Sequence, residues 1–248
     1  MPISAVLITR NAASPLADCL ASVKFCDEII VVDAGSDDGT VKIAEQHGAR
    51  VIQTEWRGFG PQKQFAVEQA RHDWVLCIDA DERVSERLRD SIRAELSNPL
   101  HAAYRFARCN RFMERYLKHG EGYPDWSLRL FDRRRARWSD DVVHEKVIAD
   151  GEIGTLGGDL LHESAESLET YLAKQNRYST LAAQEALAHG KRATVLHLLI
   201  SPSLRFIKFY FLRLGLLDGL PGLVHILVGC GASFAKYAKM LAFQRSGQ

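Results

Sequence analysis

The sequence predicts an α/β protein, in which a doubly wound and mostly parallel β-sheet is followed by a helical C-terminal extension. Short apolar runs alternate with helix-like segments through residues 3–96, which is typical of strands and crossover helices. The runs lack polar alternation, as expected for strands covered on both faces. Residues 191–245 are basic, apolar and aromatic at once. We therefore expect a sheet domain over residues 1–165 and a helical domain over residues 166–248.

Strands and helices are expected in alternation over the first part of the chain. The strands are the apolar or β-branched runs at residues 3–8, 28–32, 50–54 and 74–78. The helices carry apolar residues at helical spacing, over residues 16–23, 40–47, 61–71 and 85–96. Thr40 and Ser85 are expected to cap their helices, Gly48 to end the second helix, and Pro61 to occupy the first helical position of the third.

Residues 100–165 are less regular. Strands are expected at residues 103–108 and 128–131, with loops rich in glycine, arginine and histidine around them. A long helical pattern then occupies residues 167–189, and Gly190 ends it.

The composition is that of an ordinary globular protein, with 46% hydrophobic and 25% charged residues. The formal net charge is +1, so the overall charge does not indicate nucleic acid as a partner. The five cysteines fall at no metal-ligand spacing, and their odd number favours reduced thiols in a cytosolic protein.

Polar segments follow three of the expected strands: TRN at residues 9–11, DAGS at residues 33–36 and DAD at residues 79–81. Ligands of doubly wound sheets bind where the strands end at their carboxyl edge. Because these segments converge on that edge, the sequence predicts a ligand site there.

The DAD segment places two carboxylates, Asp79 and Asp81, on a turn after a buried strand. Mg²⁺ and Mn²⁺ bind a few carboxylate oxygens and keep positions for substrate phosphate. Unpaired carboxylates at such an edge cost stability unless something binds them, which favours a metal site that would stabilise a departing diphosphate. The alternative is a solvated acidic turn.

The segment VVDAGSDDGT, residues 31–40, is a strand that ends in an acidic, glycine-containing turn. Asp33 can accept hydrogen bonds from a nucleobase or a ribose hydroxyl, while Gly35 and Gly39 permit tight backbone conformations. The alternative is a plain strand–turn–helix connection. Neither G-x-G-x-x-G nor a Walker sequence occurs, which disfavours a dinucleotide dehydrogenase and a P-loop enzyme.

In their order and spacing, LITRN, VVDAGSDDGT and VLCIDADE resemble the nucleotide-binding half of the inverting family 2 glycosyltransferases, which have the Rossmann-like GT-A fold. The resemblance covers about the first 150 residues. It implies a nucleoside-diphosphate sugar donor, a Mn²⁺ or Mg²⁺ ion, and a single displacement that inverts the anomeric carbon. The side chains expected to bind the donor are Thr9, Asn11, Asp33, Ser36, Lys63 and Asp79. Asp81 is expected to bind the metal ion. For Lys63, a solvated helix face is the alternative.

Such a reaction needs a base, because the acceptor hydroxyl must lose its proton as it attacks. The stretch GYPDWSLRLFDR, residues 122–133, resembles the family element ED-x-x-L-x-x-R, and Asp125 matches its aspartate. The chain departs from that element at Pro124, where the family often has Glu, and at Arg129, which lies one place early. The alternative is that Asp125 only caps the following strand.

The stretch DDVVHEKV, residues 140–147, contains a VHE element that recurs in one branch of the family. His144 is expected to be a further metal ligand or to contact the diphosphate, and Glu145 is the rival base. A neutral imidazole suits Mn²⁺ better than Mg²⁺. The alternative for His144 is a hydrogen-bonded core histidine, and His162 is expected to be structural.

The C-terminal extension combines eight basic residues with a single acid, Asp218, between residues 191 and 245. This composition favours amphipathic helices in a membrane interface, with the cations facing anionic headgroups. The alternative is a pair of core-packing or dimerising helices.

The segments LRLGLLDGLPGL and FAKYAKML resemble the C-terminal part of bacterial lipopolysaccharide inner-core glucosyltransferases, which add β-1,4-linked glucose to a heptose. This resemblance implies UDP-glucose as donor, a lipid-linked saccharide acceptor, and a peripheral enzyme on the cytoplasmic face of the inner membrane. A polyprenyl phosphate, a capsule precursor or a protein remains an alternative acceptor. A sugar-phosphate nucleotidyltransferase is disfavoured because no phosphate loop follows the first strand, and a non-catalytic adaptor because the acidic motifs are present.

Overall fold

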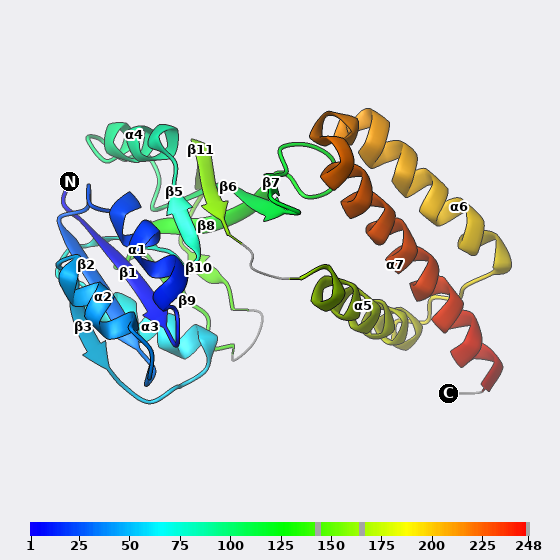
Figure 1. Ribbon diagram of the computed structural model, residues 1–248, viewed down its shortest axis with the longest axis horizontal. Helices are drawn as coiled ribbons and strands as arrows, with labels where there is room; N and C mark the ends of the chain where they lie inside the picture. The colour runs from blue at the N-terminus through cyan, green and yellow to red at the C-terminus, as the bar shows by residue number, and fades with distance from the viewer. Residues whose placement is uncertain (142–144, 164–166, 247–248) are drawn as a thin grey trace. The chain divides into compact units, whose positions relative to one another are not determined.

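A computed structural model of the chain describes residues 1–141, 145–163 and 167–246 (Figure 1). The chain forms two compact units. The first unit consists of Met1–Cys109 and Asp125–Glu163, and the second consists of Asn110–Pro124 and the chain after Glu163. The domain boundary predicted between residues 165 and 166 lies outside the described residues and stays a prediction.

The first unit is built on a twisted sheet whose strand order is β3-β2-β1-β4-β8-β6-β11-β5. The strands are β1 (Ile3–Thr9), β2 (Glu28–Asp33), β3 (Arg50–Gln53), β4 (Trp74–Cys77), β5 (Glu82–Val84), β6 (Ala103–Phe112), β8 (Asp125–Asp132) and β11 (Ile153–His162). A separate two-stranded sheet pairs β9 (Ala136–Trp138) with β10 (Val147–Ala149).

The sheet is parallel where the sequence alternates strands with helices and antiparallel beyond that region. β1 runs parallel to β2 and β4, and β2 runs parallel to β3. β8 runs antiparallel to both β4 and β6, and β5 runs antiparallel to β11. Thus the expected parallel order applies to β3-β2-β1-β4, while the whole sheet is mixed. The reason is that β6 and β8 are joined without a crossover helix, and a direct connection reverses the chain.

The helices of the first unit are α1 (Ala13–Ser22), α2 (Thr40–Gln46), α3 (Phe59–Glu68) and α4 (Glu86–Glu95). Ser85 caps α4 as predicted, and its side chain accepts a hydrogen bond from Leu88 N at 3.3 Å. The N-cap predicted for α2 was wrong by one residue, and the start predicted for α3 was wrong by two. Gly39 is the N-cap of α2, because the Thr40 hydroxyl is engaged by Ala12 N at 2.8 Å. α3 begins at Phe59, two residues before Pro61.

Alternate residues of each central strand face opposite layers of the core. Leu7 and Leu76 pack with α1, α2 and α4 on one face, whereas Val6 and Val75 pack with α3 on the other. This alternation explains why the strands read as continuous apolar runs. In the parallel strands β1, β2, β3 and β4, polar side chains accordingly lie at or near the strand ends.

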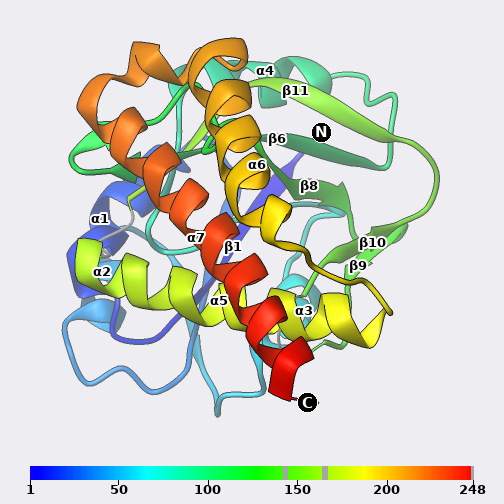
Figure 2. The same cartoon turned by 90° about the vertical axis from the view of Figure 1, so that its right-hand side faces the viewer.

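The second unit is helical, apart from the short strand β7 (Arg115–Tyr116), which pairs with the end of β6. Its helices are α5 (Leu168–Ala188), α6 (Val195–Phe206), η1 (Ile207–Leu212), η2 (Gly215–Asp218) and α7 (Gly219–Ser246). α7 packs against both α5 and α6 (Figure 2). The side chain of Asp218 is buried and accepts hydrogen bonds from Lys118 N and His119 N, which joins η2 to the loop after β7.

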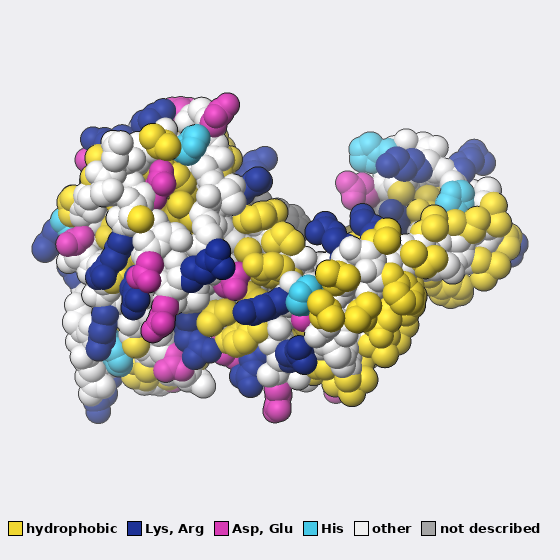
Figure 3. Space-filling view, turned by 90° about the horizontal axis from the view of Figure 1, so that it is seen from above, with side chains coloured by type: hydrophobic (Ala, Val, Ile, Leu, Met, Phe, Trp, Pro, Cys, Tyr) yellow, Lys and Arg dark blue, Asp and Glu magenta, His cyan; other side chains and the backbone are white. Residues whose placement is uncertain are grey.

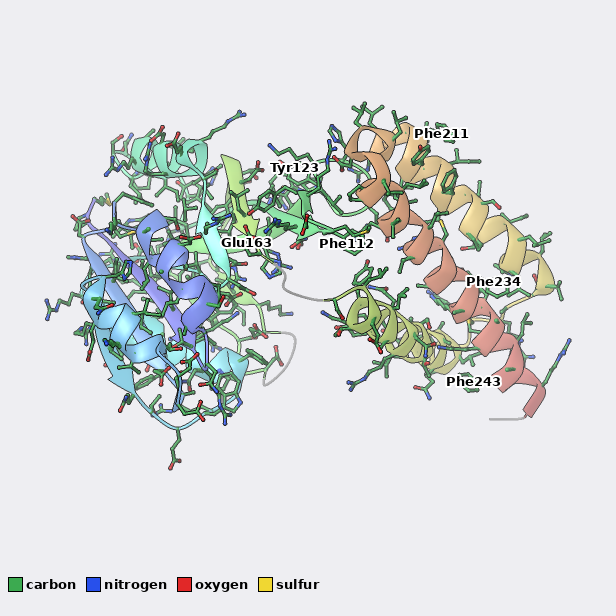
Figure 4. All side chains as sticks on the ribbon, in the orientation of Figure 1. Phe112, Tyr123, Glu163, Phe211, Phe234 and Phe243 are labelled. Atoms are coloured by element: carbon green, nitrogen blue, oxygen red, sulfur yellow. The ribbon has the colours of Figure 1, made fainter. Side chains whose placement is uncertain are left out.

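The helix α6 with η1 has an apolar surface that the protein does not cover. Two helical stretches, Val195–Leu212 and Gly215–Arg245, are long and apolar enough to cross a membrane, and none of the first stretch is buried. Figure 3 shows apolar side chains along these helices. Phe211 and Phe234, labelled in Figure 4, are each about half exposed.

Candidate active site

A cleft of about 680 Å³ lies at the carboxyl ends of the parallel strands. It is lined by the end of β1 and the segment after it, and by the DAD segment after β4. Trp56, Phe59 at the start of α3, and the last residue of β11 complete the lining. Five of its lining residues concern the chemistry below: Arg10, Asn11, Asp79, Asp81 and His162.

The turn after β2 is held by Asp33, whose side chain is fully buried. One carboxylate oxygen accepts from the Thr9 hydroxyl at 2.9 Å and the Ser36 hydroxyl at 2.5 Å. The other accepts from the backbone N–H groups of Gly35 at 3.1 Å and Ser36 at 2.8 Å. Asp33 therefore fixes the loop beside the cleft, and its contact with a nucleotide stays a prediction.

Asn11 joins the loop after β1 to the loop after β2. Its backbone adopts the left-handed conformation, with φ of 51°, which asparagine tolerates better than most residues. Its N–H donates to the Ser36 hydroxyl at 2.8 Å, and its side-chain oxygen accepts from Asp37 N at 3.0 Å. These bonds hold the two loops together at the mouth of the cleft.

Asp79 lies between two cations at the floor of the cleft. Lys63 Nζ is 3.2 Å from one of its carboxylate oxygens, and Arg129 Nη2 is 2.7 Å from the other. Each cation also pairs with a second acid: Lys63 with Glu145 at 2.9 Å and Arg129 with Glu82 at 3.3 Å. Lys63 and Arg129 are both buried.

Arg108 extends this arrangement. Its guanidinium lies 3.6 Å from Glu82 and 2.7 Å from Asp125. Acids and cations thus alternate along one continuous row, which we call the charge ladder: Asp125, Arg108, Glu82, Arg129, Asp79, Lys63 and Glu145. The ladder brings both candidate bases, Asp125 and Glu145, into the same network as Asp79.

The ladder sets the ionisation of its central acids. Burial opposes the charge of Asp79, but Arg129 and Lys63 outweigh burial and hold its pKa below the usual range. Burial raises the pKa of Glu82, and the negative charge of Asp79 raises it further. The positive charge of Arg129 lowers this pKa but does not cancel the rise. Glu82 also accepts a hydrogen bond from Asp79 N at 2.9 Å, so it holds the backbone as well as the guanidinium.

Asp81 projects into the cleft beside His162. The His162 Nε2 atom is 3.2 Å from an Asp81 carboxylate oxygen, and their side chains are 21% and 42% exposed. His162 was expected to be structural, but it lines the cleft, because β11 ends there. His144, the predicted metal ligand, lies outside the described residues. Across the described chain, no group of three or more His, Cys, Asp and Glu side chains is arranged to hold a metal ion.

Sequence reasoning did not assign several site residues, among them Arg129, Glu82, Arg108 and His162. A signal for Arg129 was present, because an arginine inside the apolar strand WSLRLFD requires a buried partner. Four arginines after β8 form a basic run that could be a solvated loop or a site for a phosphorylated acceptor: Arg133, Arg134, Arg135 and Arg137. Three of them contact other groups of the protein: Arg133, Arg134 and Arg137. Arg134 contacts Asp132 at 2.6 Å and Asp73 at 2.9 Å, which argues against a free phosphate site there.

The substitution Asp79→Asn tests the charge ladder through the pH dependence of stability. The folded-state pKa of Asp79 is lowered, so its ion pairs contribute stability above the unfolded pKa of about 4 and lose it as pH falls. We expect Asp79→Asn to lower the free energy of unfolding at pH 7 and to flatten its decline below pH 4, measured by urea unfolding at a series of pH values. Asp37→Asn, at an exposed acid on the same edge, should give a curve parallel to wild type. If the free energy of unfolding falls with the same slope below pH 4 in wild type and Asp79→Asn, then the ion pairs of Asp79 do not contribute to acid stability as expected.

Three comparisons with known proteins agree with this architecture. The family model "Glycosyl transferase family 2" matches residues 4–147. The lipopolysaccharide core biosynthesis glycosyltransferase LpsC of Rhizobium meliloti (strain 1021) is 34% identical over 254 residues, covering 97% of this chain and 92% of that protein. An uncharacterized glycosyltransferase of Rickettsia felis is 33% identical, covering 96% of this chain and 89% of its own length.

Two solved structures show the same fold. S. aureus TarS 1-349 in complex with UDP-GlcNAc superposes with a TM-score of 0.51 at 15% identity, covering 100% of this chain and 93% of that one. Mannosyl-3-phosphoglycerate synthase of Rubrobacter xylanophilus gives a TM-score of 0.50 at 19% identity, covering 79% and 77% of the two chains. These likenesses confirm the predicted fold class.

Proposed function

The chain belongs to glycosyltransferase family 2, and we propose that it is a metal-dependent inverting enzyme that transfers glucose from UDP-glucose to a lipid-linked saccharide, an inner-core heptose of lipopolysaccharide. The observation that carries the proposal is the partly exposed Asp81–His162 pair, in a cleft at the end of β1 and β4 and beside the charge ladder. The printed name of the LpsC relative, a lipopolysaccharide core biosynthesis glycosyltransferase, supports the acceptor class.

Two aromatic side chains in the cleft support a nucleotide-sugar donor. Trp56 and Phe59 line the cleft as a perpendicular pair with ring centroids 4.9 Å apart, and each is partly exposed. Exposed aromatic rings can stack on a planar nucleobase. They follow β3, on the opposite side of β1 from the β4 aspartates, so a donor lying across the strand ends would place its base near the rings and its diphosphate near Asp81.

In this proposal, the donor-binding residues act in two ways. Thr9, Asn11, Asp33 and Ser36 hold the two loops that border the nucleoside. Lys63 and Asp79 form the charged floor beneath the diphosphate, each fixed by its place in the ladder.

The Asp81–His162 pair fits a divalent metal. A carboxylate oxygen and an imidazole nitrogen 3.2 Å apart suit Mn²⁺ or Mg²⁺, with donor phosphate and water completing the coordination. When bound, the ion would stabilise the charge that develops on the departing diphosphate. Asp81 and His162 would hold the ion at the surface of the cleft, while Asp79, engaged by two cations, would position the loop that carries Asp81.

We assign the base role to Asp125. Its side chain is 41% exposed, whereas that of Glu145 is 17% exposed and bonded to the buried Lys63. A base must reach the acceptor hydroxyl, which favours the more accessible carboxylate. Arg108 keeps Asp125 in place on β8, and the proton of the acceptor hydroxyl would pass to the Asp125 oxygen that Arg108 leaves free.

The second unit supports an acceptor at a membrane surface. α6 and η1 expose Leu199, Leu204 and Phe211, and transferring such side chains from water into lipid is favourable. We propose that these helices lie in the interface of the inner membrane, on its cytoplasmic face, where a lipid-linked saccharide would be presented. A polyprenyl-phosphate, capsule or protein acceptor is the alternative, and incubating each candidate with radiolabelled UDP-glucose separates them.

Asp81→Ala is expected to abolish turnover and to remove the increase in UDP affinity that Mn²⁺ gives wild type. The reason is that the substitution deletes the carboxylate ligand. Isothermal titration calorimetry with UDP, in Mn²⁺ and in EDTA, measures the effect, and EDTA should also abolish wild-type turnover. Asp37→Ala, which removes an exposed acid outside the cleft, should behave like wild type. A Mn²⁺ dependence that survives Asp81→Ala would refute the assignment.

Asp125→Asn is expected to lower kcat by about 10²- to 10⁴-fold, the usual contribution of a general base, while UDP affinity stays unchanged. Steady-state kinetics together with UDP titration separate the two effects. Glu145→Gln is the isosteric comparison and should have a much smaller effect on kcat. The opposite ranking would identify Glu145 as the base.

Leu199→Glu is expected to reduce flotation with anionic liposomes about tenfold or more at low salt, because it places a charge on the apolar face of α6. Gln184→Glu, at an exposed polar position of α5, adds the same charge and should float like wild type. Failure of the wild-type protein to float would reject the membrane interface altogether.

A further inference from the structure

Of the described residues that line the cleft, Arg10 is the one lysine or arginine. Its side chain is exposed, and among the described residues it makes no hydrogen bond, ion pair or ring contact. The cleft therefore contains a permanently charged guanidinium whose five donors are unused by the protein.

Two other cations near the cleft, Lys63 and Arg129, are already compensated. Lys63 pairs with Asp79 and Glu145, and Arg129 pairs with Asp79 and Glu82. Moving either cation to a ligand would leave a carboxylate without its partner. Arg10 forms no ion pair among the described residues, so an anionic ligand can bind it without separating it from a carboxylate.

Strand pairing places the segment that carries Arg10 beside the segment that carries Asp81. β1 and β4 are parallel neighbours, and their register pairs Val6 with Cys77. The segments that follow the two strands, with Arg10 on one and Asp81 on the other, therefore leave the sheet at the same edge and line the same cleft. The aromatic pair Trp56 and Phe59 follows β3, farther along the sheet.

We propose that Arg10 binds the diphosphate of the nucleotide-sugar donor and remains bound to the leaving group during transfer. This inference rests on the proposed function. In the reaction, the bond between the anomeric carbon and the β-phosphate oxygen breaks, and its electron pair stays on that oxygen. The acceptor oxygen forms the new bond and gives its proton to the base. A guanidinium can hold phosphate oxygens with two parallel hydrogen bonds as this negative charge develops.

The test is a comparison of UDP, UMP and uridine binding to wild type and Arg10→Ala, by isothermal titration calorimetry in EDTA. Because EDTA removes divalent metal, any preference for phosphate then depends on protein groups. We expect wild type to bind UDP more tightly than uridine, and Arg10→Ala to lose about 10- to 100-fold of UDP affinity while keeping its uridine affinity. Arg10→Lys should recover part of the loss, since lysine keeps the charge but not the paired donors.

Arg57→Ala is the matched control. Arg57 is also exposed and belongs to the segment before α3. Its guanidinium carbon lies 4.1 Å from the centroid of the Phe65 ring, and it does not line the cleft. Its loss should leave the UDP-to-uridine ratio unchanged. An unchanged ratio in Arg10→Ala, or an equal loss for uridine and UDP, would overturn the inference while leaving the donor assignment intact. A wild-type protein that binds neither UDP nor UDP-glucose would instead remove the proposed function itself.

Discussion

Arg129 ion-pairs with Asp79 and Glu82 from the interior of β8, and the arrangement of the site depends on this contact. The guanidinium is buried, as is the Glu82 carboxylate, so removing either group would leave the other charge without compensation in a poorly solvated place. The pair also determines where Asp79 lies, because Glu82 accepts the Asp79 backbone N–H while Arg129 holds its carboxylate. These contacts with Asp79 fix the turn that carries Asp81.

The charge ladder separates the fixed groups of the site from those available to a ligand. Of its central members, Lys63, Glu82 and Arg129 are buried and Asp79 is partly buried. Their charges neutralise one another, which makes them a rigid floor of the cleft. Arg10, which is exposed, and Asp81, whose side chain is 42% exposed, line the cleft together with His162. Preorganisation of this kind lowers the ordering that a charged ligand must impose when it binds.

The two units bury apolar surface in different ways. The sheet of the first unit is covered on both faces, as its uninterrupted apolar strands require. In the second unit, α7 is packed between α5 and α6, yet α6 and η1 leave leucines and phenylalanines in contact with solvent. Exposed apolar surface of this extent is unusual for a helix that meets only water, and it is the observation behind the proposed membrane interface.

The sequence alone determined the parts of this protein that depend on local patterns. The apolar runs located the parallel strands, Ser85 marked a helix start, and DAD marked the edge where the cleft lies. Only the tertiary structure decided which charges meet. Arg129 on β8 reaches Asp79, which follows β4, because β8 lies beside β4 in the sheet. His162 reaches Asp81 because β11 ends at the cleft. Both partners are far from these aspartates along the chain. Strand order is set by packing over the whole sheet, so no spacing between residues in the sequence could show that Arg129 compensates Asp79 or that His162 faces Asp81.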